Sequence, residues 1–155
     1  KLLSLDTSSS STGWALFING KYSNSGLLDL KIKDSSERMR QMVLKIRDLI
    51  DHYSPAIVVI ETPVVVRNPQ VQRMLTMIFG AVYAKCVFDN IEFQELRPTE
   101  WRKAIDTGKK PKKRDELKEW SKSKVKDFFN LNVNDDISDA ILIGQAYANI
   151  FNGGD

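Results

Sequence analysis

The distribution of apolar and polar residues predicts that the chain begins as an antiparallel meander of three strands. Two short apolar runs, residues 2–8 and 12–18, flank a turn made of Ser, Thr and Gly. A third run, residues 21–30, follows Asn19-Gly20, a dipeptide that favours a tight hairpin turn. Because short turns join strands that are neighbours in sequence, we expect the three runs to pair with one another.

The rest of the chain alternates between helical and strand patterns. The segment "AIVVIE", Ala56–Glu61, is a β-branched run without alternation, which is typical of a central strand covered on both faces, and residues 91–96 alternate as a further strand. We therefore predict a single α/β domain, residues 1–155, with a mixed sheet of three antiparallel strands and then parallel strands, flanked by helices. Helical spacing of apolar residues appears at 35–53, 69–89, 98–105, 113–129 and 135–151.

The composition indicates in which cellular compartment the protein is expected. No run of about 18 consecutive apolar residues indicates a membrane span, and no charged stub before a short apolar run indicates a secretory signal. The single cysteine, Cys86, lies in an apolar helical pattern and is interpreted as a core residue. We expect an intracellular, cytoplasmic protein without membrane contact.

The charge of the chain is unevenly distributed. Residues 97–126 contain twelve Lys or Arg against five Asp or Glu, a local charge of +7, while the remainder has 11 basic and 15 acidic residues. A basic segment on a mildly acidic body is typical of a protein that binds a polyanion such as nucleic acid. A solvated, Lys-rich helix on an ordinary surface would give the same composition, so charge alone leaves both interpretations open.

Four carboxylates are candidate active-site residues, because two end predicted strands and two share a face of the last helix. Asp6 ends the first strand and Glu61 ends the buried strand, and parallel neighbours present their carboxyl ends at one sheet edge. Asp136 and Asp139, three residues apart in "DDISDA", share a face of the last helix. Each acid alone has a structural explanation: hydrogen bonds to turn amides, the end of a strand, or a helix cap.

Taken together, the four acids imply a cation, because carboxylates that follow core strands are rarely buried without a positive partner. Oxygen ligands without His or Cys suit Mg²⁺, with Mn²⁺ as a plausible substitute. Two such ions about 4 Å apart clamp the attacking and leaving oxygens of a phosphoryl transfer. The chemistry predicted is phosphodiester hydrolysis with two ions per active site.

The motifs "LDTSSSSTGWAL", "VVIETP" and "DDISDAILIG" resemble, in order and context, those of RuvC-like Holliday junction resolvases of the RNase H superfamily, particularly the small phage-type members. The resemblance covers nearly the whole chain. It implies a metal-dependent endodeoxyribonuclease that nicks four-way junctions and other branched DNA. The matching acids are Asp6, Glu61, Asp136 and Asp139, and Asp135 is then interpreted as the helix cap.

The resemblance also implies a homodimer with two active sites. The broad apolar stripe of the helix at 69–89 makes it the expected dimer face, with Met74 and Ile78 as candidate outward positions. A catalytic lysine is expected in the basic loop, where Lys112 or Lys113 matches best, although a plain phosphate contact is an equal alternative. The expected DNA-binding residues are Arg97, Arg102, Lys103, Lys109, Lys110, Lys112, Lys113 and Arg114.

Several interpretations stay open. The small residues after Asp6 are expected to let a DNA backbone approach the metal, but a plain flexible hairpin would need the same composition. Trp101 is interpreted as packing under the basic loop rather than stacking on a base. The aromatic residue that bacterial members carry soon after the glutamate is replaced by Thr62, Pro63 and valines. A DNA-binding module with reduced activity and an ATP-binding fragment of the actin and sugar-kinase fold are the alternative functions.

Overall fold

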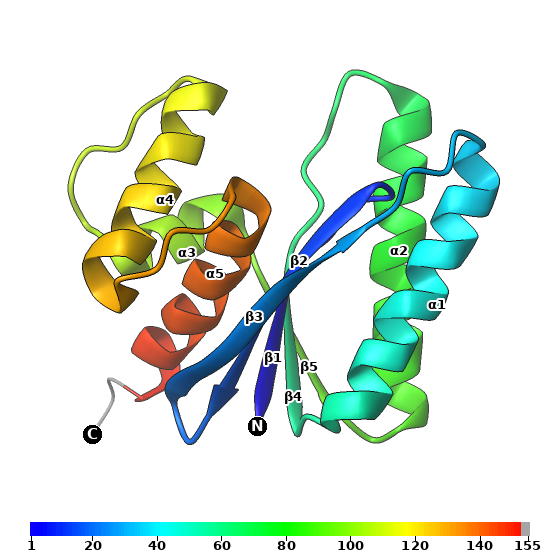
Figure 1. Cartoon of the computed structure of the whole chain (residues 1–155), viewed down its shortest axis with the longest axis horizontal. Helices are drawn as coiled ribbons and strands as arrows, with labels where there is room; N and C mark the ends of the chain where they lie inside the picture. Colours follow the sequence, from blue (N-terminus) through cyan, green and yellow to red (C-terminus); the bar gives the residue numbers. More distant parts are fainter. Residues whose placement is uncertain (153–155) are drawn as a thin grey trace.

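The chain folds around a five-stranded sheet with helices on both faces (Figure 1). The computed structural model describes residues 1–152. Every predicted element is present, with its ends within two residues of the prediction. The strands are β1 (Leu2–Asp6), β2 (Ser11–Ile18), β3 (Lys21–Asp29), β4 (Ile57–Glu61) and β5 (Glu92–Leu96). The helices are α1 (Ser35–Tyr53), α2 (Pro69–Phe88), α3 (Pro98–Ile105), α4 (Arg114–Phe129) and α5 (Asp135–Asn152).

The strand order is β3-β2-β1-β4-β5, and it combines both kinds of pairing. β1, β2 and β3 form the predicted antiparallel meander, whereas β4 pairs in parallel with both β1 and β5. The mixed α/β prediction is therefore confirmed. Because Leu5 lies opposite Ile60 in the parallel pair, β1 and β4 end at the same edge of the sheet.

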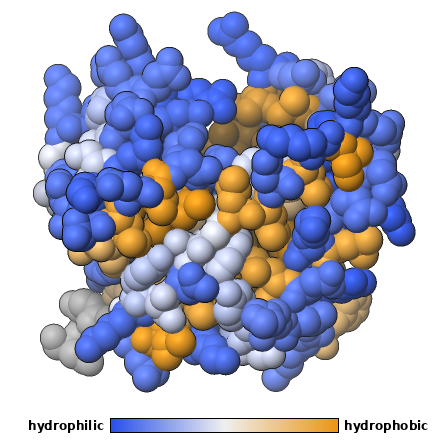
Figure 2. All heavy atoms as spheres, viewed as in Figure 1, coloured by the Kyte–Doolittle hydropathy of each residue, from blue (hydrophilic) through white to orange (hydrophobic). Residues whose placement is uncertain are grey.

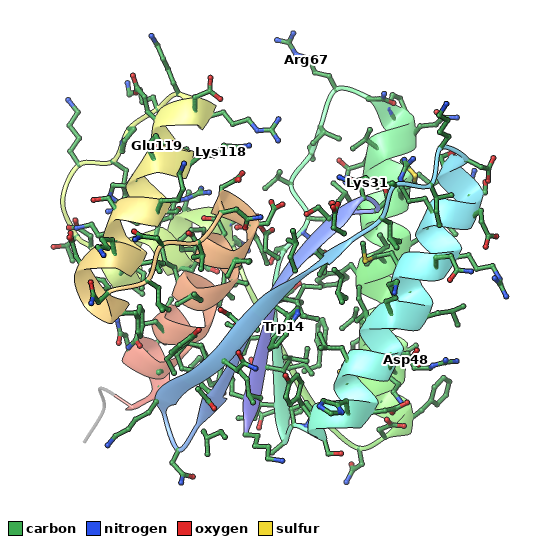
Figure 3. The ribbon with its side chains drawn as sticks, in the orientation of Figure 1. Trp14, Lys31, Asp48, Arg67, Lys118 and Glu119 are labelled. Carbon is green, nitrogen blue, oxygen red and sulfur yellow. The ribbon has the colours of Figure 1, made fainter. Side chains whose placement is uncertain are left out.

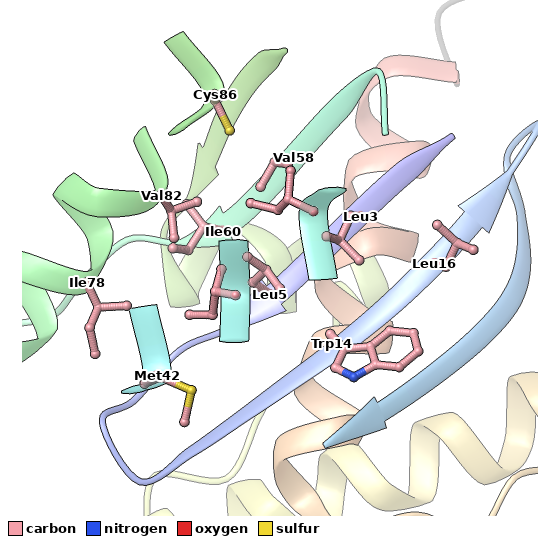
Figure 4. Packing of buried hydrophobic residues seen from close by; sticks show 12 residues of the cluster. Leu3, Leu5, Trp14, Leu16, Met42, Val58, Ile60, Ile78, Val82 and Cys86 are labelled. Atoms are coloured by element: carbon pink, nitrogen blue, oxygen red, sulfur yellow. The ribbon is translucent and has the colours of Figure 1, made fainter. Parts of the chain in front are cut away.

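Helices α1 and α2 cover one face of the sheet, and α5 covers the other with α3 and α4 beside it (Figure 1). The pleat of β1 sends Leu3 and Leu5 toward α1 and α2, where they pack in one apolar cluster (Figure 4). A second cluster lies between the sheet and α5. Its buried members include Ala15, Phe17 and Ile141.

Helix α5 approaches the sheet closely because small residues line the contact. Ser4 of β1 is fully buried and its Oγ donates a hydrogen bond of 2.6 Å to the backbone oxygen of Ala140. A Cβ on Gly13 would lie 2.0 Å from the backbone oxygen of Asp136, and one on Gly144 would lie 2.3 Å from the Phe17 ring. These contacts fix α5 against β1 and β2.

Helix α2 is apolar on both its inner and its outer side. Ile78 and Cys86 are fully buried, and burial raises the pKa of the Cys86 thiol to about 11, so the cysteine is a core residue as predicted. Ile78 was expected to face outward, and that expectation is wrong because it packs with the strands of the sheet. The large apolar residues exposed on α2 are Val71, Met77, Tyr83, Val87 and Phe88.

By length and composition alone, α2 is also the one helix within residues 1–152 that is long and apolar enough to cross a membrane. This is weak evidence for a span, since helices of soluble cores meet the same criterion. The inner side of α2 packs on the sheet through Ile78, Val82 and Cys86. The absence of a membrane-spanning segment therefore stays a prediction.

The contact at Gly13 generates a test of the fold. Gly13→Ala should destabilise the protein by about 1–3 kcal/mol or more, because the new methyl group would meet backbone atoms of Asp136 that cannot move independently. Gly80→Ala on α2 is the matched control, since its Cβ would have no neighbour within 4 Å and Ala is the better helix former by about 0.5–1 kcal/mol. Urea unfolding measures both changes. An unchanged stability of Gly13→Ala would contradict the assigned packing.

Candidate active site

Asp6 and Glu61 meet at one edge of the sheet, as predicted. Asp6 is the last residue of β1 and Glu61 the last of β4, one position beyond the paired residues Leu5 and Ile60. Asp6 is also the antiparallel partner of Gly13 on β2, and Gly13 touches the backbone of Asp136. One glycine thus lies between the acid of the first strand and the first turn of α5.

The acids of α5 face this edge of the sheet. Asn134, the residue before α5, caps the N-terminus of the helix. The Asn134 side chain accepts a hydrogen bond of 2.9 Å from the backbone N–H of Ile137, which is the geometry of a helix cap. The interpretation of Asp135 as the cap is therefore wrong. Asp135 instead forms an ion pair of 2.8 Å with Lys118 of α4, and this hydrogen-bonded partner lowers the pKa of Asp135.

Three of the four predicted site acids, Asp136, Glu61 and Asp139, each accept a hydrogen bond from an uncharged side chain. Ser11 Oγ donates to Asp136 Oδ2 at 2.6 Å, and Trp101 Nε1 donates to Glu61 Oε2 at 2.5 Å. Ser121, buried on α4, donates to Asp139. Neither Trp101 nor Ser121 is near these acids in sequence. No local pattern in the sequence therefore indicates that they act as donors.

The electrostatics of the site are those of crowded negative charge. Burial, followed by the charges of Asp139 and Glu61, raises the pKa of Asp6 well above its ordinary value. Burial also raises the pKa of Glu61, against the opposing effects of the Trp101 hydrogen bond and the positive charge of Arg102. For Asp139, burial raises the pKa to about 7 even though the Ser121 hydrogen bond lowers it.

The donor set suits a hard divalent cation. Asp139 Oδ1 is buried and has no hydrogen-bond partner within residues 1–152, and a bound cation would satisfy such an oxygen. In the part of the chain that the structure describes, no group of three or more His, Cys, Asp or Glu side chains has the geometry of a metal site. Repulsion between like charges opposes the approach of carboxylates, and a bound cation would offset that repulsion.

The Ser-rich turn after Asp6 is tied by its own hydroxyl groups. Ser8 Oγ donates to the Ser11 backbone oxygen at 2.6 Å and accepts from the Ser11 N–H at 3.0 Å. Thr12 Oγ1 donates to the Ser8 backbone oxygen at 3.2 Å. This network disfavours the interpretation of the turn as a plain flexible hairpin. The role of its small side chains in admitting a phosphate stays a prediction.

The basic residues fall into two groups. Arg97 just before α3 and Lys103 on α3 are exposed, as are Lys109, Lys112, Lys113 and Arg114 in or at the end of the α3–α4 loop. Lys110 turns back and donates to the backbone oxygens of Asp106 and Gly108. The catalytic assignment of Lys112 or Lys113 stays a prediction, because no contact of these side chains with the four acids is recorded within residues 1–152.

Arg102, by contrast, lies at the acids. Its guanidinium carbon is 4.6 Å from the centre of the Trp101 ring, and its charge lowers the pKa of both Glu61 and Asp139. Its Nε is buried without a hydrogen-bond partner in the described chain. Trp101 is fully buried, so its predicted packing role is confirmed.

Cationic side chains also flank this end of the sheet. Figure 3 shows Lys118 on α4 and Arg67 at the top of the view, on the loop between β4 and α2. In the space-filling view the same end is bordered by hydrophilic side chains on both sides (Figure 2). This end of the sheet is therefore bordered by water-facing side chains, and Lys118 and Arg67 are among the cations near it.

A family model described as "Crossover junction endodeoxyribonuclease RuvC" matches residues 2–146. The crossover junction endodeoxyribonuclease RuvC of Hydrogenovibrio crunogenus is 24% identical over 109 residues, which cover 68% of this chain. The matched segment spans 63% of the length of that relative.

Solved structures show the same fold. The RuvC of Thermus thermophilus in complex with a Holliday junction substrate matches with a TM-score of 0.76 at 14% identity, covering 99% of this chain and 96% of that one. A second structure of Thermus thermophilus RuvC gives a TM-score of 0.75 at 15% identity, with the same coverage. The yeast mitochondrial Holliday junction resolvase gives 0.59 at 13% identity, covering 96% and 77%. The fold is thus RNase H-like, and because the family model spans most of its length, the chain belongs to the RuvC family of crossover junction endodeoxyribonucleases.

Proposed function

We propose that the protein is a divalent-metal-dependent endodeoxyribonuclease that nicks four-way junctions and other branched DNA. The observation that carries the proposal is the convergence of carboxylates from β1, β4 and α5, with the buried, unpartnered oxygen of Asp139 among them. Membership of the RuvC family and a fold shared with a junction-bound relative support it. The basic residues of α3 and the following loop supply a surface for DNA phosphates.

Asp6, Glu61, Asp136 and Asp139 would hold the divalent ions. We propose Mg²⁺, with Mn²⁺ as a substitute and two ions per site. When bound, such ions lower the pKa of a water molecule and neutralise charge on the phosphate that it attacks. The chain's own part is to hold these oxygens in place, through the hydrogen bonds from Ser11, Trp101 and Ser121.

The basic residues would act on the DNA phosphate. Arg102, whose charge acts on Glu61 and Asp139, would contact a phosphate held at these acids, and Lys112 or Lys113 would reach it from the loop. A fixed cation there stabilises the charge that develops on the phosphate oxygens as the bond to the leaving oxygen breaks. Lys118 is paired with Asp135, which offsets the negative charge of that additional acid.

A homodimer through α2 completes the proposal. The outer side of α2 exposes Met77, Tyr83, Val87 and Phe88. Burial of these apolar side chains against a second copy would favour association. Two copies related by a two-fold axis would present two active sites to a junction of matching symmetry.

The alternative functions lack a specific observation in their favour. A module that binds branched DNA without cutting it would not need Asp6, Glu61 and Asp139 to be held at one place. An ATP-binding protein of the actin and sugar-kinase fold would need a second glycine-rich phosphate loop. The two adjacent glycines of the sequence, Gly153 and Gly154, lie outside the described residues.

The metal assignment predicts the effect of Asp6→Asn. Loss of this ligand should slow nicking of a synthetic four-way junction by about a hundredfold or more, while binding of the junction stays equal or becomes tighter because one negative charge is lost. Single-turnover rates with Mg²⁺ and gel-shift assays without it measure the two effects. Asp48→Asn, on the exposed side of α1, is the control and should behave as wild type. Equal nicking rates for Asp6→Asn and wild type would refute the assignment.

The basic residues can be separated into binding and catalytic ones. Ala at a residue that only contacts DNA phosphate should weaken junction binding and lower the slope of log K against log salt by roughly 0.9. Its rate at saturating protein should hardly change. Ala at a residue that stabilises the transition state should cut that rate about a hundredfold with nearly normal binding. We expect the second result for Arg102 and for one of Lys112 and Lys113. If all three variants cleave normally at saturation, the basic residues serve binding alone.

The dimer proposal is tested at an exposed position of α2. Met77→Glu should give monomers, because an unpaired charge at the centre of a buried interface is costly. Phe128→Glu on α4 is the matched control, since it also replaces an exposed apolar side chain, and it should leave the mass unchanged. Sedimentation equilibrium reports the mass, after circular dichroism has shown that both variants fold. A dimeric Met77→Glu would exclude this face, and a monomeric wild type would exclude the dimer.

A further inference from the structure

Trp101 combines complete burial with a hydrogen bond to an active-site acid. The residue has no exposed surface, yet its Nε1 lies 2.5 Å from Glu61 Oε2. The two residues are 40 positions apart, on α3 and at the end of β4. A side chain needed only for packing would leave the indole N–H to a backbone oxygen or to water, whereas this one points at a carboxylate proposed to bind metal.

The backbone that carries the indole is fixed at the start of α3, and other side chains pack on the ring. The Arg97 backbone N–H donates to the Glu100 side chain at 2.8 Å, and the Trp101 backbone N–H donates to the Arg97 backbone oxygen at 3.1 Å. The Trp101 ring packs against that of Trp120, with 6.3 Å between ring centres, and the Arg102 guanidinium lies over it. A donor fixed in this way holds its acceptor in one orientation.

The chemistry of the indole suits a metal ligand. Its N–H can only donate and carries no charge, so it orients a carboxylate without neutralising it. A lysine in the same place would pair with Glu61 and compete with a cation for its charge. Because Oε2 accepts the indole hydrogen bond, Oε1 is the oxygen of Glu61 left entirely for a cation.

We propose that Trp101 is a positioning residue of the active site, whose indole N–H fixes the orientation in which Glu61 presents its free oxygen to a divalent cation. The inference rests on the proposed function in one respect, that the acids bind such a cation. It assigns to α3 a role beyond carrying basic residues toward DNA.

Trp101→Phe tests the inference because it keeps an aromatic ring and removes the donor. We expect the dissociation constant for Mn²⁺, measured by calorimetry on the DNA-free protein, to rise about tenfold or more. Junction binding in EDTA should be unchanged, and excess Mg²⁺ should recover part of the lost nicking rate. Trp120→Phe is the control, since it truncates the neighbouring ring of the same cluster, and its Mn²⁺ affinity should stay within about twofold of wild type.

Two results would overturn the inference. One is an Mn²⁺ affinity of Trp101→Phe equal to that of wild type. The other is an equal loss in both variants, which would assign the effect to packing rather than to the donor. If wild type binds Mn²⁺ but nicks no branched DNA, the proposed function fails while the inference about Trp101 stands.

An observation on the unmodified protein covers the case in which Trp101→Phe does not fold. The chain has three tryptophans, so its nitrogen–proton spectrum should contain three indole resonances, from Trp14, Trp101 and Trp120. Substoichiometric Mn²⁺ should broaden the Trp101 resonance first, because its N–H touches a proposed ligand. Equal broadening of all three, or none, would contradict the assignment.

Discussion

Four carboxylates converge on one end of the sheet although their charges repel, and the structure depends on how this is done. The raised pKa of Asp6 reflects that repulsion together with burial. What opposes it is packing: β1 and β4 lie side by side in parallel, and α5 rests on the sheet through Ser4 and Gly13. Side chains with more volume at these two positions would push the acids of α5 away from those of the sheet.

The way in which the acids are held bears on what they can bind. Ser11, Trp101 and Ser121 are neutral donors, so they order the carboxylates and leave most of the negative charge uncompensated. Arg102 is the cation that acts on the site itself, and Lys118 acts on the outer acid, Asp135. We propose that such a site attracts a divalent cation, and with it a phosphate that would otherwise be repelled.

Much of this arrangement could be predicted from the sequence, because it follows from local patterns. Strand ends placed Asp6 beside Glu61, and the three-residue spacing placed Asp136 and Asp139 on one helix face. The hydrogen bond of Trp101 could not be predicted, because it depends on how α3 is set against β4. Three further features depend on tertiary packing in the same way: the burial of Ile78, the pairing of Asp135 with Lys118, and the place of Arg102.

We propose that packing assembles a divalent-cation site whose acids repel one another until a cation neutralises them. Thermal unfolding of the DNA-free protein with and without Mg²⁺, at equal ionic strength, tests it most directly. A cation that binds only the folded state stabilises it by about 2.7 kcal/mol at a hundred times its dissociation constant, so the melting temperature should rise with Mg²⁺ and also with Mn²⁺. A melting temperature that is the same in Mg²⁺, Mn²⁺ and NaCl of matched ionic strength would contradict the claim.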